Sequence, residues 1–168
     1  MFKQANKILL MLIIILIIIA ADQLSKWYIV QNIALWNFQR VSPFLNLIHT
    51  TNYGISFGMF SEEGIPSIFF IAAALLFCLA LFIWAFKSSE KHIEKFCALI
   101  IGGAIGNVTD RIIHGSVIDF IDLHFMSLHF PAFNIADSCI CIGAALVMIA
   151  PFLEKKITAV AMKRQSIN

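Results

Sequence analysis

Two aspartates lie in surroundings that do not favour a charged side chain. Asp137, in "FNIADS", comes just before the apolar run "CICIGAALVMIAPFL", and Asp119, in "VIDF", lies between apolar neighbours. A carboxyl group in such a place can act as a general acid or base, or can relay protons. If Asn134 caps a helix here, Asp137 also suits the first turn, where a carboxylate complements the helix dipole. Capping does not account for a carboxylate kept next to hydrocarbon, so the sequence favours a functional role.

A further polar group lies in "GGAIGNVTDR". Asn107, Asp110 and Arg111 are about one helical turn apart and would line one face of a helix. Arg111 could form an ion pair with Asp110, so a structural role and direct chemistry both remain open for this group. In "DQLSK", Asp22 and Lys26 have the i, i+4 spacing of a structural ion pair at a helix end.

Two weaker signals complete the set of candidates. Asn52 precedes Gly54 in "NYGISFG" and is either a turn residue or a group that holds substrate. Asp119 and Asp122 would share one face of a helix, which together with His124 leaves a metal site open. The sequence contains neither H-E-x-x-H nor G-x-S-x-G, so a zinc peptidase of that type and a serine hydrolase have no support.

Composition indicates where these residues must be positioned. The chain of 168 residues suits a single domain, 1–168, and 60% of the residues are hydrophobic while 13% are charged. With a mean hydropathy of +0.88, this composition is typical of an integral membrane protein with several spans. A net charge of +2, without a basic run interleaved with aromatic residues, gives no reason to expect a nucleic-acid partner.

Four apolar windows predict transmembrane helices at about 8–27, 65–86, 96–113 and 135–153. The first window could be a secretory signal peptide, but its poor cleavage site and the three later windows favour a retained helix. Nine of the twelve Lys and Arg residues lie before the first span, between the second and third, or after the fourth. By the positive-inside rule both termini are cytoplasmic, and all five aspartates then lie at the outer face.

The two outer segments, 28–64 and 114–134, have different patterns. The first is rich in β-branched and aromatic residues and predicts short strands that form a small curved sheet on the membrane surface. The second predicts an interfacial segment, half sunk in the headgroups. Gly102 and Gly106 have the small-xxx-small spacing that lets another helix approach closely. The expected fold is therefore a membrane all-α protein of four transmembrane helices with a small β element.

Taken together, these motifs resemble one family. The stretches "DQLSK", "NYGISFG", "GGAIGNVTDR", "VIDF" and "FNIAD" occur here in the order and approximate spacing of the bacterial lipoprotein signal peptidases, or type II signal peptidases. Each motif alone is a weak signal, whereas five in register are specific. Ile55 and Ser56 depart from the small residues that are common between the two glycines of "NYGISFG", which could alter substrate contacts.

The resemblance implies an aspartyl endopeptidase of the bacterial plasma (inner) membrane, with its active site at the outer (periplasmic or extracytoplasmic) face. Such an enzyme removes the signal peptide from diacylglyceryl-modified prolipoproteins, on the N-terminal side of the lipidated cysteine, and is inhibited by globomycin. Its expected partners are these precursors, membrane lipid and globomycin-type inhibitors, and the expected state is a monomer. The catalytic pair maps onto Asp119 and Asp137. The supporting positions map onto Asp22, Asn52, Asn107, Asp110, Arg111 and Asn134.

Acid–base chemistry accounts for the pairing that the resemblance implies. Two carboxyl groups that share a site cannot easily both ionise, so they hold one proton between them. The ionised member can take a proton from a bound water while the protonated member polarises the scissile carbonyl group. No metal and no other cofactor is needed for this reaction.

Two other classes of protein compete with this interpretation. A small proton-coupled transporter or channel subunit would also place aspartates in a membrane, but here the acids cluster at one rim and none lies at mid-span. A purely structural or assembly protein would predict that the aspartates tolerate replacement by alanine with no loss beyond stability.

Overall fold

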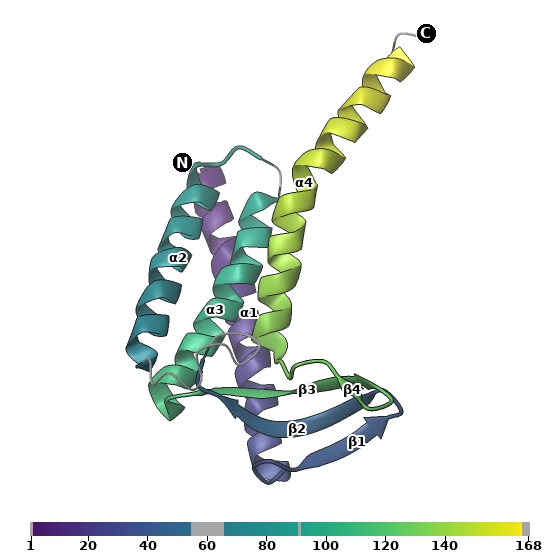
Figure 1. Cartoon of the computed structure of the whole chain (residues 1–168). Helices are drawn as coiled ribbons and strands as arrows, with labels where there is room; N and C mark the ends of the chain where they lie inside the picture. The colour runs from purple at the N-terminus through teal and green to yellow at the C-terminus, as the bar shows by residue number, and fades with distance from the viewer. Residues whose placement is uncertain (1, 55–65, 91, 166–168) are drawn as a thin grey trace.

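The computed structural model describes residues 2–54, 66–90 and 92–165. Ile55 and Ser56 lie outside the described residues. Within the described residues, four helices and four strands follow one another in the order α1 (Phe2–Asn32), β1 (Phe38–Ser42), β2 (Leu45–Asn52), α2 (Ser67–Lys87), α3 (Ile93–His114), β3 (Val117–Phe125), β4 (Leu128–His129) and α4 (Ile135–Gln165). The helices form a bundle with the sheet across one end (Figure 1). The predicted combination of membrane helices with a small β element is confirmed.

Each predicted span falls largely within one helix. Among the described residues, α1, α2 and α3 are long and apolar enough to cross a membrane, and the apolar stretch Ile135–Ala150 of α4 is shorter. The first helix extends past the predicted end at residue 27 because Ile29 continues its apolar face and packs, together with Ile33 just beyond the helix, against Phe120 of the sheet. Residues 28–32, which were predicted to begin the first outer segment, are therefore helical and part of α1.

Helix α3 occupies the centre of the bundle, in contact with α1, α2 and α4. Its glycines allow this. A Cβ atom at Gly102 would lie 3.0 Å from the Cβ of Ile18 in α1, and one at Gly106 would lie 2.8 Å from a carboxylate oxygen of Asp22. The predicted close approach at both glycines is confirmed. Gly103, which the spacing did not single out, faces α4, where a Cβ atom would lie 2.3 Å from the carbonyl oxygen of Ala136.

The sheet is antiparallel, with strand order β1-β2-β3-β4. The first outer segment supplies β1 and β2, as predicted, and the second supplies β3 and β4, which join the same sheet. That the second segment lies at the membrane interface stays a prediction. In β3, Asp119 pairs with Thr50 and Asp122 pairs with Asn46 of β2. Because side chains alternate between the faces of a strand, residues three apart point to opposite sides. The predicted shared helical face of Asp119 and Asp122 is therefore wrong.

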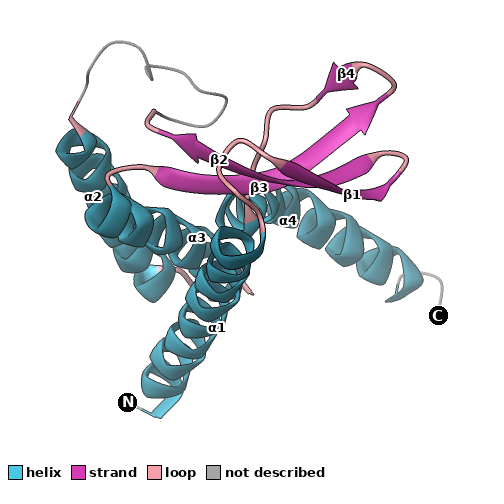
Figure 2. Cartoon of the chain, turned by 90° about the horizontal axis from the view of Figure 1, so that it is seen from below, coloured by secondary structure: helices cyan, strands magenta, loops and turns pink. Residues whose placement is uncertain are grey.

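The sheet lies across the end of the bundle at which α3 ends and α4 begins (Figures 1 and 2). The start of α1, the connection between α2 and α3, and the far end of α4 lie away from it (Figure 1). Phe120, with Leu47 and Ile121 beside it, packs on the last turns of α1. The fold thus places Asp119, on β3, close to the first turn of α4, which carries Asp137.

The close packing at Gly103 generates a stability prediction. Gly103→Ala forces a methyl group against the backbone of α4, which cannot yield as a side chain can, so we expect the free energy of unfolding to fall by about 1–3 kcal/mol and Tm to fall with it. Gly102→Ala is the matched control, since it meets only the Ile18 side chain and gains helix propensity of about 1 kcal/mol. Thermal unfolding in detergent measures both; equal Tm values for the two variants would contradict this packing.

Candidate active site

Asp119 and Asp137 line the same two cavities. One, of about 240 Å³, lies among α2, α3 and β3, and its polar wall is formed by Asn52, Asn107 and Arg111 together with the two aspartates. The other, of about 250 Å³, lies between the two aspartates and the apolar segment 130–133, with Cys141 of α4 on its far wall. Two carboxyl groups from a strand and a helix, separated along the chain, thus face a common space.

Asn134 touches both aspartates. Its Nδ2 donates to Asp119 Oδ1 at 2.7 Å, and its Oδ1 accepts from the backbone N–H of Asp137 at 2.8 Å. In return, Asp137 Oδ2 accepts from the backbone N–H of Asn134 at 3.2 Å. This reciprocal pair of bonds is a capping box at the start of α4. The predicted N-cap is confirmed, and capping and site geometry turn out to use the same two residues.

Two further amides orient the carboxylates. Asn107 Nδ2 donates to Asp137 Oδ1 at 2.8 Å, and Asn52 Nδ2 donates to Asp119 Oδ2 at 3.0 Å. Asn52 also forms a turn, because its Oδ1 accepts from the backbone N–H of Gly54 at 3.0 Å. The interpretation of Asn52 as a turn residue is therefore confirmed. That Asn52 holds substrate stays a prediction, although its contact with Asp119 places it at the candidate site.

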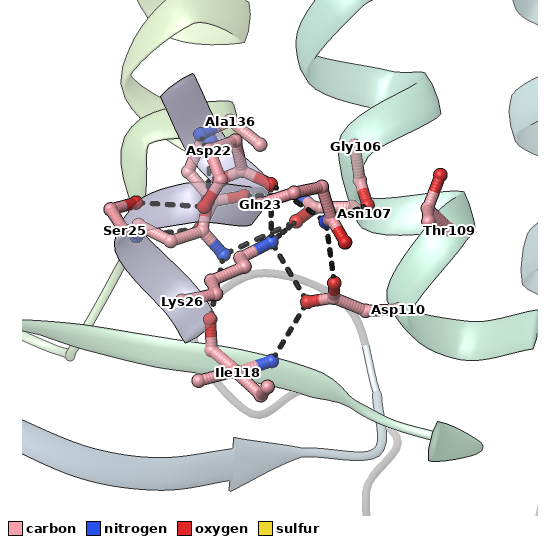
Figure 3. Close-up of polar contacts among 12 residues, drawn as sticks. Asp22, Gln23, Ser25, Lys26, Gly106, Asn107, Thr109, Asp110, Ile118 and Ala136 are labelled. Carbon is pink, nitrogen blue, oxygen red and sulfur yellow. Dashed lines mark hydrogen bonds and ion pairs between the residues drawn. The ribbon is translucent and has the colours of Figure 1, made fainter. Parts of the chain in front are cut away.

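Behind these amides lies a buried lysine (Figure 3). Lys26 is 2% exposed, and its Nζ lies 2.7 Å from Asp22 Oδ2, 2.8 Å from Asp110 Oδ2 and 3.1 Å from Asn107 Oδ1. The predicted Asp22–Lys26 ion pair is confirmed, and Lys26 also contacts side chains of α3. Since Asn107 also donates to Asp137, a chain of contacts runs from the ammonium group of α1 to the aspartate of α4.

The carboxylates of this network also hold backbone groups. Asp22 Oδ1 accepts from the backbone N–H of Ala136 at 3.0 Å, at the N-terminus of α4, and Asp110 Oδ2 accepts from that of Ile118 at 3.1 Å, in β3. Gln23, which the sequence analysis did not select, donates to Asp110 Oδ1 at 2.8 Å. Its only signal was its place within "DQLSK", because a contact between α1 and α3 leaves no mark in local spacing.

Arg111 does not make the expected ion pair with Asp110, which pairs with Lys26 instead. Successive helical residues point about 100° apart, so Asp110 faces α1 while Arg111 faces the cavity. The guanidinium group donates to the carbonyl oxygen of Gly54 at 2.5 Å and lies 5.5 Å from the ring centroid of Phe70. Arg111 therefore links the cavity wall to the turn that follows β2.

Burial sets the protonation of Asp119. Removal from water raises its pKa first, the nearby carboxylate of Asp137 raises it further, and the bond from Asn52 only partly offsets them, so that the pKa is raised to about 7. Asp119 can therefore hold a proton near neutral pH. A protonated carboxyl beside an ionised one is the arrangement that acid–base hydrolysis requires.

Asp122 belongs to a separate cluster. Its carboxylate accepts from Asn46 Nδ2 at 2.8 Å and lies 2.8 Å from Nδ1 of His129. Burial alone would raise the pKa of Asp122, but the hydrogen bonds from His129 and Asn46 hold it below its usual value. Within the described part of the chain, no three His, Cys, Asp or Glu residues are arranged to hold a metal ion. Asp119, Asp122 and His124 do not come together.

Known proteins are similar to this chain in sequence and in fold. A family model described as "Signal peptidase (SPase) II" matches residues 14–153. Proteins named lipoprotein signal peptidase from Yersinia enterocolitica and from Shewanella baltica are 41% and 42% identical over 139 residues, which cover 81% of this chain and 82% and 81% of theirs. A solved structure described as a bacterial membrane enzyme superposes with a TM-score of 0.77 at 30% identity, covering 86% of this chain and 88% of its own. A second reaches 0.73 at 31%, covering 83% and 90%.

The buried network predicts a large effect at Asp22. Asp22→Ala removes a partner of Lys26 and the acceptor for the Ala136 N–H, and breaking a buried pair costs about 3–5 kcal/mol. We expect Tm in detergent to fall sharply for Asp22→Ala, and less for Asp22→Asn, which keeps an acceptor oxygen. Asp122→Ala, in the separate cluster, serves as the control. A native Tm for Asp22→Ala would show that the network does not stabilise the fold.

Proposed function

The chain belongs to the signal peptidase II family, and we propose that it acts as an aspartyl endopeptidase that cleaves diacylglyceryl-modified prolipoproteins N-terminal to the lipidated cysteine. Membership of this family makes the chain a membrane-bound peptidase of prolipoprotein signal peptides. The observation that carries the aspartyl mechanism is that Asp119 and Asp137 line the same cavities while Asn134 contacts both. Neutral amides orient the two carboxyls, and neither forms an ion pair within the described residues.

In the proposed reaction Asp119 holds the shared proton and Asp137 is ionised. Asp137 takes a proton from a water in the cavity, the water oxygen attacks the scissile carbonyl carbon, and the Asp119 hydroxyl protonates the carbonyl oxygen. Collapse of the tetrahedral intermediate returns that proton to Asp119, while Asp137 donates the other to the leaving amine. Both acids finish in their starting states, so water is the only co-reactant.

The two cavities differ in a way that suits a lipidated peptide. Asn52 and Arg111 offer amide and guanidinium N–H groups in the first cavity, which can bind the carbonyl oxygens of an extended peptide. The second cavity is walled by Phe130, Pro131 and Phe133, and its apolar surface suits the acyl chains on the modified cysteine. We place the scissile bond between them, at the aspartates.

The orientation follows from charge. The start of α1 and the far end of α4 lie at the end of the bundle away from the sheet (Figure 1), so the positive-inside rule puts both in the cytoplasm. Of the cations assigned to the outer side, Lys26 is buried in ion pairs and Arg111 lines a cavity, so they add little outward charge. The single domain, 1–168, then has its site at the periplasmic face of the inner membrane. It acts as a monomer, and globomycin-type inhibitors compete with the precursor for this site.

Replacement of either catalytic carboxyl tests the mechanism. Asp119→Asn and Asp137→Asn keep the size and one acceptor oxygen but cannot exchange a proton, so we expect cleavage to fall by at least about 10²–10⁴-fold while the chain stays folded and inserted. Mass measurement of the peptide released from a diacylglyceryl-modified precursor, with and without globomycin, gives the readout. Asp122→Asn is the matched control.

Either variant retaining native turnover would remove that residue from the reaction. Proton flux through vesicles containing the native chain, without peptidase activity, would support the transporter interpretation instead.

The raised pKa of Asp119 predicts the alkaline limb of the pH–rate profile. Since the reaction needs a protonated Asp119, kcat should fall as pH rises through about 7, by roughly tenfold for each further unit. Steady-state cleavage of a lipidated precursor at a series of pH values measures this limb. Asp122→Asn should keep the same limb, because its carboxylate lies in another cluster. A rate that stays constant as pH rises through this range would contradict the assignment of the proton.

A further inference from the structure

One end of the sheet carries an exposed apolar surface, which we call the sheet tip: Phe44, Leu123, Phe125, Met126, Leu128 and Phe130. Phe125 is 72% exposed, Met126 81% and Leu128 76%. The hairpin that carries them, residues 123–133, contains no Lys, Arg, Asp or Glu. Protein surfaces in contact with water rarely expose large apolar side chains side by side in this way. We therefore expect a partner to cover the sheet tip.

The backbone conformation of the hairpin turn also indicates that its exposed apolar side chain has a function. Phe125 pairs with Leu128, so Met126 and Ser127 form a two-residue turn. Such turns favour asparagine or glycine, which tolerate positive φ, yet here Met126 adopts φ 55°. A large apolar residue that is 81% exposed thus occupies an unfavourable backbone conformation in this turn. Strain retained in this way indicates a function for the side chain.

The surroundings of the hairpin identify the partner as lipid. Both views show the hairpin reaching past the helix bundle, and Figure 1 shows it near the level at which α4 begins. Phe130 lines a shallow cavity of about 390 Å³ at the sheet tip and also the cavity that contains Cys141. Next to Cys141 on α4, Ile142 is 54% exposed. Apolar side chains are therefore exposed both at the sheet tip and on α4, one of the four helices expected to lie in the bilayer.

We propose that the sheet tip inserts into the bilayer leaflet on the sheet's side, with its side chains among the first carbons of the acyl chains. Leu123 and Phe125 are exposed on one face of β3, whereas Asp122 and His124 point to the other face, where Asp122 is buried, so the exposed face of the strand is the apolar one. The surface is thus a lipid anchor outside the spanning helices.

The anchor is coupled to the active site through the chain that follows it. Phe130 packs edge-on against Phe133, with ring centroids 5.9 Å apart, and both line the cavity next to Asp119 and Asp137. Insertion of the sheet tip therefore sets this apolar cavity at the depth of the acyl chains, where a lipid-modified substrate carries its own anchor.

Site-directed fluorescence tests the insertion independently of peptidase activity. The four native cysteines are replaced by alanine in the full chain, and an environment-sensitive probe is attached at Met126→Cys or, as a second site, at Leu128→Cys. Gln39→Cys on β1 is the matched control, since Gln39 is exposed and polar and lies on the far edge strand. In phosphatidylglycerol–phosphatidylethanolamine vesicles, lipids brominated on the acyl chains and aqueous iodide serve as the two quenchers.

We expect brominated lipid to quench the probe at 126 or 128 several-fold more than at 39, and iodide to show the opposite order. In the Leu128→Cys background, Met126→Asn suits the left-handed turn and should keep the hairpin folded while lowering quenching by brominated lipid. Quenching of the tip probes by iodide alone would overturn the proposal, because the tip would lie in water. Protection from both quenchers would also overturn it, because protein, such as a second copy of the chain, would then cover the tip.

Discussion

The whole site depends on one buried ammonium group. Lys26 lies where α1 passes α3, and a charge there must be compensated because little water reaches it. Asp22 and Asp110 compensate it directly, and both carboxylates also accept backbone N–H groups, from α4 and β3 respectively. One lysine therefore fixes α1, α3, α4 and the sheet relative to one another. The two elements that carry the reactive carboxyls, β3 and α4, are thus positioned by a pair of carboxylates that take no part in the proposed reaction.

The same arrangement keeps the Lys26 ammonium group out of direct contact with the reactive pair. Lys26 reaches Asp137 only through the amide of Asn107, and Asn134 and Asn52 hold Asp119 through neutral N–H groups. A cation in direct contact would favour the ionised form of Asp119, whereas an amide orients the carboxyl with less effect on its charge. Burial and the neighbouring carboxylate then dominate, and the pKa of Asp119 stays near neutrality. For this reason the Asp119 carboxyl can be held in a fixed orientation and still retain its proton.

Local sequence predicted the parts of this site that depend on local geometry. Hydropathy located the helices, the spacing of Asn134 and Asp137 indicated an N-cap followed by a first-turn carboxylate, and an i, i+4 spacing indicated the pair that includes Lys26. Contacts between distant segments could not be derived in this way. The strand that carries Asp119 and Asp122 is stabilised by pairing with β2, far away in the chain, so its apolar pattern alone was equally consistent with an interfacial segment. The meeting of the two catalytic candidates was inferred from motif resemblance, since no spacing rule joins a strand to a helix.

The central claim is that Asp119 carries a proton that it shares with an ionised neighbour. Infrared difference spectroscopy of the native chain during a pH titration, with Asp119→Asn as the reference, measures that proton directly. We predict a protonated-carboxyl C=O band that disappears as pH rises through about 7 and that is missing from the variant. Native and variant spectra with the same carboxyl bands throughout the titration would show that Asp119 is ionised, and would contradict the mechanism.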